Sequence, residues 1–255
     1  MKTSVALSAF MFMAVVATGM PVSAQETSRN IVLVHGAFTD ETSWTPVADI
    51  LSSRGFNVVA VKNPLTSLAD DVDATRDVLD GLSGPTVLVG HSWGGVVIGE
   101  AGNDEKVKAL VYVSAFAPDR GETLAALSAH GPGTEGVKAI HPNEHGFLFV
   151  DEQAYPTVFA EDLPHAQAEV MARNQIPLHA SAFQTPAEIA AWHEHPNYYV
   201  VTGKDLMLGV DAQRFFAERM GAETLTINAG HTGLISQAAQ VAAFIETAAS
   251  PVSVK

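Results

Sequence analysis

The chain has 255 residues, of which 47% are apolar, and this is enough to bury the core of one large domain. Its 14 lysine and arginine residues against 28 aspartate and glutamate residues give a formal net charge of −14, which argues against nucleic acid as a partner. A count of 0 cysteines excludes disulfides, thiolate metal sites and a cysteine nucleophile.

The first 24 residues have the pattern of a secretory signal peptide. Lys2 is followed by an apolar run, and Pro21 precedes the small-x-small tripeptide Val22-Ser23-Ala24. The apolar stretch before Gly19 is shorter than the ~20 residues that a membrane-spanning helix needs. We therefore expect cleavage after Ala24, a mature domain over residues 25–255 without a stable membrane anchor, and a periplasmic or secreted location.

Six short apolar runs in the remaining chain predict strands that are buried on both faces. They are Ile31–Val34, Phe56–Val61, Thr86–Val89, Ala109–Val113, Tyr198–Thr202 and Thr224–Ile227. Helical spacing lies between several of these runs, in Leu68, Val72, Thr75, Leu79 and Leu82 and again in Ile235, Ala238, Val241 and Ile245. Strands that alternate with helices predict an α/β fold with a mostly parallel sheet.

This alternation fails between about residues 117 and 192, where the chain is rich in loops and has one or two short helical patterns. We interpret this part as an insertion, not as a second sheet-forming domain. It leaves one strand and returns before the next, so it should form a cap over the sheet edge where ligands bind. Large apolar side chains here favour a hydrophobic acyl or alcohol group, although packing of the cap explains each one equally well: Phe147, Phe149, Tyr155, Phe159, Met171, Phe183 and Trp192.

The segment Gly90-His91-Ser92-Trp93-Gly94 matches the G-x-S-x-G pattern directly after a predicted strand and directly before a helix. A strand that turns into a helix this sharply strains the serine backbone, and side chains at the two glycine positions would collide with neighbouring elements. The turn presents the Ser92 hydroxyl for attack. The structural alternative is a serine that caps the helix.

A neutral serine needs a base within hydrogen-bonding reach and a group that orients this base. His231 and Asp205 each follow one of the last two predicted strands, and Ser, Asp, His is the order that this motif carries. Two rival acids are weaker candidates, because Asp211 lies within the next predicted helix and Asp119 follows an earlier strand.

The oxyanion of the intermediate needs two N–H donors. Trp93 offers one at the start of the helix, and the loop after the first strand offers the other from Ala37, or else from Phe38. His35 and His91 adjoin these two loops, where we expect structural hydrogen bonds instead of general base catalysis.

Two closely spaced histidine pairs could be taken for metal ligands: His141 with His145, and His193 with His195. Neither pair has a third ligand at a recognised spacing, so we expect polar residues at the surface or along a pocket, and no metal or organic cofactor.

In this order and spacing, VLVHGAF, GHSWGG, VTGKD and AGHTG resemble the α/β-hydrolase superfamily, in particular the compact group with plant methyl esterases, hydroxynitrile lyases and many bacterial serine esterases. NPLTSLADDV, ALVYVSAFAPDRGE and KDLMLGVDAQRF also resemble this group, the last with Gln213 at the family's distance from the acid. The resemblance implies about six parallel strands with a small helical cap. It also implies a triad of Ser92, Asp205 and His231, with the amides of Ala37 and Trp93 for the oxyanion.

Three positions depart from the relatives. The lyases carry a lysine after the catalytic histidine, where this chain has Thr232, and their threonine in the first loop is replaced by Gly36, which argues against cyanohydrin cleavage. Trp93 is bulkier than the residue that esterases usually carry, so we expect an altered pocket wall beside the oxyanion site.

The sequence thus predicts an exported serine hydrolase that cleaves carboxylic esters of small apolar or aromatic substrates through an acyl-Ser92 intermediate. One alternative is a receptor-like homologue that binds a ligand with little turnover. Another is the same triad used for lactone or amide hydrolysis or for perhydrolysis, because pocket shape selects the acceptor and the leaving group.

Overall fold

The computed structural model describes residues 30–128 and 133–250. The predicted signal peptide, residues 1–24, lies outside the described residues. Within the described ranges no helix has both the length and the apolar character that a membrane crossing requires.

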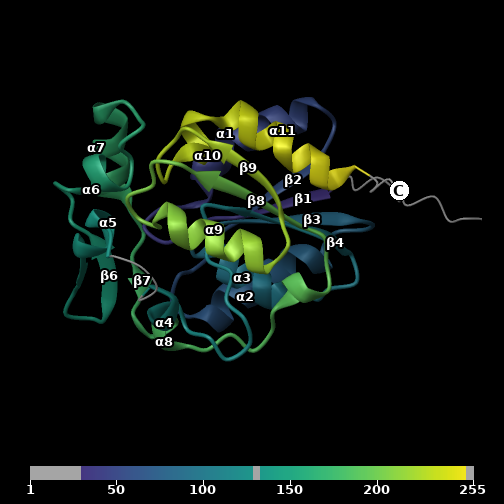
Figure 1. The fold of residues 1–255 in the computed structure, drawn as a ribbon, viewed down its shortest axis with the longest axis horizontal. Coiled ribbons are helices and arrows are strands. Elements are labelled where there is room, and N and C mark those ends of the chain that lie inside the picture. The colour runs from purple at the N-terminus through teal and green to yellow at the C-terminus, as the bar shows by residue number, and fades with distance from the viewer. Residues whose placement is uncertain (1–29, 129–132, 251–255) are drawn as a thin grey trace, which may run out of the picture.

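A parallel sheet of six strands forms the centre of the protein (Figure 1). The strands are β1 (Asn30–Val34), β2 (Asn57–Val61), β3 (Thr86–His91), β4 (Val107–Val113), β8 (Asn197–Thr202) and β9 (Glu223–Ile227), in the spatial order β2-β1-β3-β4-β8-β9. All six predicted strands are confirmed, with ends that differ from the prediction by one or two residues. The predicted α/β architecture with a mostly parallel sheet is confirmed as well.

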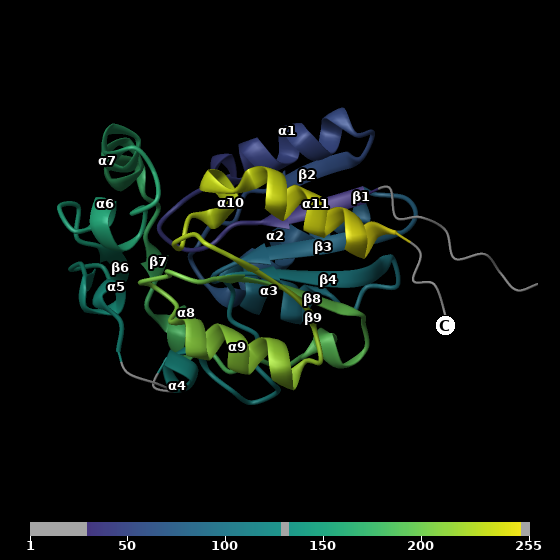
Figure 2. The same ribbon diagram turned by 45° about the horizontal axis from the view of Figure 1, so that its top comes forward.

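Helices cover both faces of this sheet (Figure 2). One face carries α1 (Thr45–Ser53), α10 (Gly233–Ser236) and α11 (Ala238–Ala249), preceded along the chain by the short 3-10 helix η1 (Glu41–Trp44). The other carries α2 (Leu68–Asp80), α3 (Gly94–Ala101) and α9 (Val210–Arg219). Each layer packs on its own apolar cluster, so the sheet separates two cores.

Helix α2 illustrates how local sequence sets an element. The Ser67 side chain accepts a hydrogen bond from the amide of Asp70, and Asp70 and Asp71 place negative charge in the first turn, where the helix dipole favours it. The buried residues repeat on one face, as the sequence spacing predicts, but the helix ends at Asp80, before Leu82.

The central strands are buried throughout, whereas the two edge strands are partly exposed. Every residue of β1, β3 and β8 is buried, and β4 exposes only Lys108. In β2 and β9 a single residue of each, Val61 and Ile227, is fully covered. The prediction of strands covered on both faces therefore holds for the centre of the sheet and not for its edges, because an edge strand has a neighbour on one side only.

The segment between β4 and β8 forms the cap, which lies at one end of the sheet (Figure 1). Its helices are α4 (Leu124–Ser128), α5 (Glu135–Lys138), α6 (Tyr155–Val158), α7 (His165–Asn174) and α8 (Ser181–Gln184), followed by the 3-10 helix η2 (Ala191–His193). It also holds an antiparallel sheet of β5 (Ile140–Pro142), β6 (Phe147–Val150) and β7 (Leu178–His179).

This small sheet is an addition to the small helical cap that the sequence predicts. The three strands have only two to four residues each, which is too short for an alternating pattern to stand out in the sequence. Their pairing depends on chain segments that only the fold brings together.

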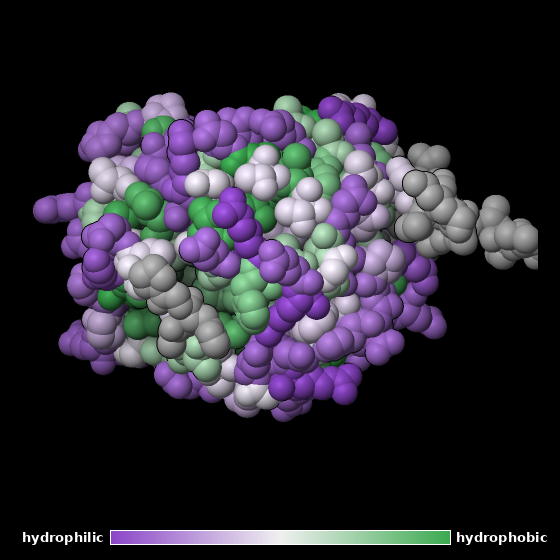
Figure 3. Space-filling view, in the orientation of Figure 1, coloured by the Kyte–Doolittle hydropathy of each residue, from purple (hydrophilic) through white to green (hydrophobic). Residues whose placement is uncertain are grey.

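The surface of the protein is mainly polar. Figure 3 shows a face on which hydrophilic residues predominate, with smaller apolar areas between them. Four large apolar side chains count as exposed among the described residues: Val137, Val170, Leu206 and Phe215.

Two valines in register on neighbouring strands test how much the covered sheet contributes to stability. Val32 of β1 is fully buried, and its partner Val59 on edge strand β2 is partly exposed. We expect Val32→Ala to lower the free energy of unfolding by about 1–3 kcal/mol, through lost apolar contact and an unfilled cavity. Val59→Ala should cost less than half as much, as measured by urea unfolding followed by circular dichroism. Equal losses would contradict this assignment of the core.

Candidate active site

Ser92 lies in a tight turn between the end of β3 and the start of α3. Its φ of 51° is in the left-handed region, which is costly for a residue with a side chain. A Cβ on Gly90 would lie 2.5 Å from the carbonyl oxygen of Gly94, and a Cβ on Gly94 would lie 2.4 Å from that of Val34 on β1. Both glycines are therefore needed for the close approach, as the sequence analysis predicts.

Ser92 does not cap helix α3, which was the structural alternative for this residue. Helix α3 begins after Trp93, which is its cap residue, and no side-chain capping bond is present. No hydrogen bond to Ser92 Oγ is found among the described residues, and Ser92 lines a cavity together with His231. The hydroxyl is thus available to a ligand.

The Trp93 side chain turns away from solvent and packs beneath this turn. It is 1% exposed, and its Nε1–H donates to Asp71 Oδ2 of α2 at 2.7 Å. Asp71 Oδ1 accepts from the amide of Leu65 at 2.7 Å. Burial nevertheless raises the pKa of Asp71 to about 6, against the effect of these two donors. The bulky side chain expected beside the oxyanion site therefore also anchors the turn to α2.

Asp205 and His231 meet as the sequence predicts. His231 Nδ1 lies 2.9 Å from Asp205 Oδ2, and both side chains are almost completely buried. Since a carboxylate can only accept, His231 carries its proton on Nδ1 and leaves Nε2 as an acceptor. No hydrogen bond joins Ser92 Oγ to His231 Nε2 among the described residues, although both residues line the same cavity. Catalytic hydrogen bonds often reach their full geometry only when substrate is bound.

The Asp205 carboxylate is surrounded by further donors. Oδ1 accepts from the amides of Met207 and Leu208 at 2.8 Å each, and Oδ2 accepts from Thr202 Oγ1 at 2.9 Å and from Gln213 Nε2 at 3.0 Å. Hydrogen bonds to a carboxylate offset the cost of removing its charge from water.

Gln213 links this network to the sheet. It is fully buried, its Nε2 also donates to the carbonyl of Leu208 at 2.7 Å, and its Oε1 accepts from the amide of Thr202 at 2.9 Å. The sequence singles out Gln213 only through the family resemblance. In the structure, the hydrogen bonds of Gln213 hold the loop that carries Asp205.

The loop after β1 supplies a free backbone donor. The amide of Phe38 donates to the carbonyl of Ile176 in the cap at 3.0 Å, so this alternative donor is occupied. The amides of Ala37 and Trp93 find no acceptor in the part of the chain that the structure describes, and both residues line the cavity beside Ser92. These two N–H groups are the ones available to an oxyanion.

His35 and His91 have the structural roles that the sequence suggests. His35 Nδ1 donates to the carbonyl of Gly36 at 2.8 Å, and its Nε2 accepts from the amide of Asn63 at 3.1 Å. His91 Nε2 donates to the carbonyl of His231 at 3.0 Å. Burial lowers the pKa of His35 and, together with nearby His231, that of His91 well below the ordinary value, so both rings are neutral.

The cavity at Ser92 has a volume of about 220 Å³ and walls that are mostly apolar. Of the seven large apolar side chains that the cap sequence offers as candidates, only Phe159 and Phe183 line the cavity. The other apolar walls come from six separate chain segments, which no local sequence pattern connects. They are Phe116, Leu124, Val137, Ile140, Leu178, Met207 and Leu208. Tyr155 instead lies behind the wall, where its hydroxyl donates to the carbonyl of Phe38 at 2.9 Å.

The rival acids lie away from His231. The Asp211 side chain is 93% exposed, and Asp119 Oδ1 contacts His193 Nε2 at 3.0 Å. His195 Nε2 donates to the carbonyl of Gly102 at 2.7 Å. Within the described ranges, no three His, Asp or Glu side chains are grouped as a metal site would require.

Glu161 is a residue that sequence reasoning does not find. Both of its carboxyl oxygens are buried without a hydrogen-bond donor from another described residue, beside the loop that holds His231. Burial raises its pKa to about 7 from an ordinary 4.5, and the charge of Asp205 adds to this rise.

Comparisons with known proteins show which family and which fold this chain resembles. The model of the alpha/beta hydrolase family matches residues 31–244. A probable hydrolase R7 of Phoma sp. is 28% identical over 223 residues, which cover 79% of this chain and 90% of the relative. The crystal structure of a pyrethroid hydrolase from Sphingobium faniae superimposes with a TM-score of 0.75 at 23% identity, covering 86% of this chain and 96% of that one. That of polyneuridine aldehyde esterase gives 0.73 at 21% identity, covering 85% and 97%.

Glu161 makes stability depend on pH in a defined direction. The unfolded chain loses this proton near pH 4.5 and the folded chain near pH 7, so folding stability falls as the pH rises between these values. Glu161→Gln keeps the shape without the charge. We expect its melting temperature to exceed that of the unsubstituted protein at pH 8 and to match it near pH 4.

Glu152, an exposed glutamate of the cap, is the matched control, and Glu152→Gln should leave the pH dependence unchanged. A Glu161→Gln variant with the same pH dependence as the unsubstituted protein would contradict the prediction.

Proposed function

The chain belongs to the alpha/beta hydrolase family, and on this basis we propose that it is a serine hydrolase that cleaves carboxylic esters of small apolar or aromatic substrates. The observation that carries the proposal is the meeting of an unpaired Ser92 hydroxyl, the His231–Asp205 pair and two free amides at one apolar cavity. Names of relatives support ester hydrolysis, since they include a pyrethroid hydrolase and a carbendazim hydrolyzing esterase.

In the proposed first step, Ser92 Oγ forms a bond to the ester carbonyl carbon while its proton passes to His231 Nε2. The electron pair of the carbonyl moves to its oxygen, which accepts hydrogen bonds from the amides of Ala37 and Trp93. Asp205 stabilises the charged imidazole through the 2.9 Å contact to Nδ1.

When the intermediate collapses, the bond to the alcohol oxygen breaks and the leaving alcohol takes the proton from His231. Water then attacks the acyl-Ser92 ester with His231 as base, which releases the acid and returns the proton to Ser92. Neither step calls for a metal ion or an organic cofactor.

The size and polarity of the cavity support a small apolar substrate. Its volume of about 220 Å³ is below the ~300 Å³ at which pockets for drug-sized ligands begin. Apolar walls favour a short aliphatic or aromatic group, because they offer few partners to a polar one.

We further propose that the protein is exported after removal of residues 1–24. This rests on the pattern of Lys2, the apolar run and Val22-Ser23-Ala24. Mass spectrometry of the processed protein should find Gln25 at its N-terminus, whereas retention of Met1 in the folded product would refute the proposal.

Ser92→Ala is the direct test of the nucleophile. We expect hydrolysis of p-nitrophenyl acetate to fall by at least about 1,000-fold and labelling by a fluorophosphonate to vanish, because both reactions use the Ser92 hydroxyl as nucleophile in the proposed mechanism. Ser128 lines the same cavity, so Ser128→Ala is the matched control and should keep both activities. Full esterase activity in Ser92→Ala would refute the proposed mechanism.

The cavity volume also predicts a chain-length profile. Acetate and butyrate esters should have a higher kcat/KM than the octanoate ester, because a longer acyl chain leaves less of the cavity beside Ser92 for the alcohol group. A kcat/KM that rises steadily to octanoate would mean that the acyl group occupies a different part of the protein.

A further inference from the structure

A carboxylate of the cap holds the loop that carries His231. Asp162 lies between α6 and α7, and its Oδ2 accepts from the amide of Gly230 at 3.2 Å. Its Oδ1 accepts from Thr232 Oγ1 at 2.5 Å, and its Oδ2 also accepts from the hydroxyl of Ser236. The residues immediately before and after His231 are therefore both bound to one side chain.

His231 is held from three directions, and each holder belongs to a different part of the chain. Asp205, after β8, binds ring atom Nδ1, and His91, at the end of β3, binds the backbone carbonyl. Asp162 binds both flanking residues, and it alone of these three belongs to the cap.

Glu161 shows how closely the cap segment fits this loop. A Cβ on Gly230 would lie 2.1 Å from Glu161 Oε1, so a larger residue before His231 would displace the Glu161 carboxyl group. Phe159 of the same segment also contacts the His231 ring edge to face, with centroids 5.1 Å apart. The contact of Asp162 with the loop thus belongs to a packed interface.

We propose that Asp162 is a positioning residue that aligns His231 with Ser92, so that seating of the cap and placement of the general base are coupled. The inference rests on the proposed serine hydrolase function. The contacts of Asp205 and His91 hold His231 itself, at the ring and at the carbonyl, whereas the contacts of Asp162 hold the residues on either side of it. Displacement of a catalytic group by about 1 Å can cost about 100-fold in rate.

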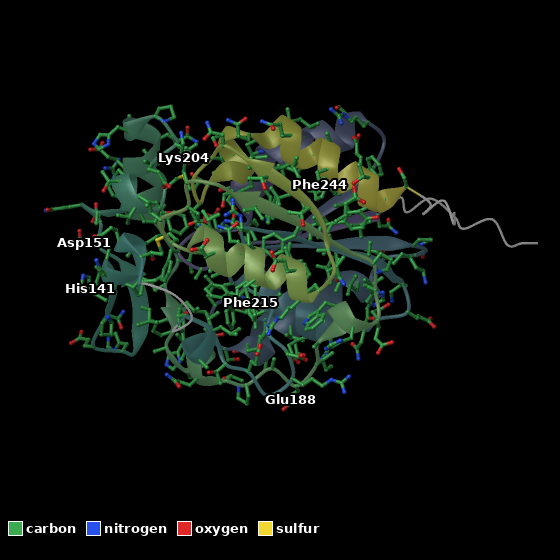
Figure 4. All side chains as sticks on the ribbon, viewed as in Figure 1. His141, Asp151, Glu188, Lys204, Phe215 and Phe244 are labelled. Atoms are coloured by element: carbon green, nitrogen blue, oxygen red, sulfur yellow. The ribbon has the colours of Figure 1, made fainter. Side chains whose placement is uncertain are left out.

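The test compares variants of Asp162 with a matched cap carboxylate. Asp151, labelled in Figure 4 on the cap, accepts from the amides of Gln153 and Ala154 at 3.0 Å each and makes no contact with the His231 loop. Asp162→Ala should lower kcat by about 10-fold to 100-fold with KM within about twofold of that of the unsubstituted protein. Asp162→Asn, which keeps one acceptor oxygen, should lose less, and Asp151→Ala should keep the original kcat.

Two readouts distinguish positioning from general stability. The rate of fluorophosphonate labelling at Ser92 should fall in the same proportion as kcat, because labelling needs the same base. The proton between His231 Nδ1 and Asp205 should give a downfield NMR resonance in the unsubstituted protein, which broadens or disappears in Asp162→Ala and not in Asp151→Ala.

The proposal is overturned if Asp162→Ala keeps kcat, labelling and the downfield resonance, or if Asp151→Ala loses them equally. If Asp162→Ala does not fold, Asp162→Asn and Thr232→Val decide, since each weakens the same contacts with a smaller change of shape. Failure of the proposed function has a separate signature: the unsubstituted protein would neither hydrolyse esters nor be labelled, and the NMR comparison alone would then decide the role of Asp162.

Discussion

The tight reversal of the chain at Ser92 is the constraint on which the rest of the site depends. Its left-handed backbone costs about 1–3 kcal/mol, and the fold holds it by hydrogen bonds on both sides. The Ser92 amide donates to the carbonyl of Val113 on β4, and the Ser92 carbonyl accepts from the amides of Gly95 and Phe116. Because the turn is fixed to the sheet, the hydroxyl faces the cavity and the amide of Trp93 stays free at the start of α3.

Charge in this interior depends on how many donors surround each carboxyl group. Asp205 has five, including His231, and these offset the loss of hydration. Asp71 has two, and burial raises its pKa to about 6; Glu161 has no donor from another described residue, and its pKa rises to about 7. Asp71 and Glu161 follow the general rule that burial with few hydrogen-bond donors favours the neutral carboxyl group.

The cap forms part of the cavity wall and also holds two loops of the site. Phe159 and Phe183 form walls, while Tyr155 and the carbonyl of Ile176 hold both sides of Phe38, next to the free amide of Ala37. Asp162 holds the opposite side of the site, at the His231 loop. In the proposed mechanism, the oxyanion loop and the general base therefore both depend on contacts with the cap. The proposal thus links the cavity walls that the cap supplies to the geometry of the reacting groups.

Local patterns in the sequence determine the six strands of the main sheet, the turn at Ser92, and the order in which Ser92, Asp205 and His231 follow their strands, because each depends on residues that are neighbours along the chain. The sequence misses the three-stranded sheet of the cap and most of the cavity wall. It also has no signal for Asp162, whose partners lie about 70 residues away. Such contacts carry no periodicity or local motif, so only the tertiary structure decides which side chains meet, how much water remains around them, and what charge they hold.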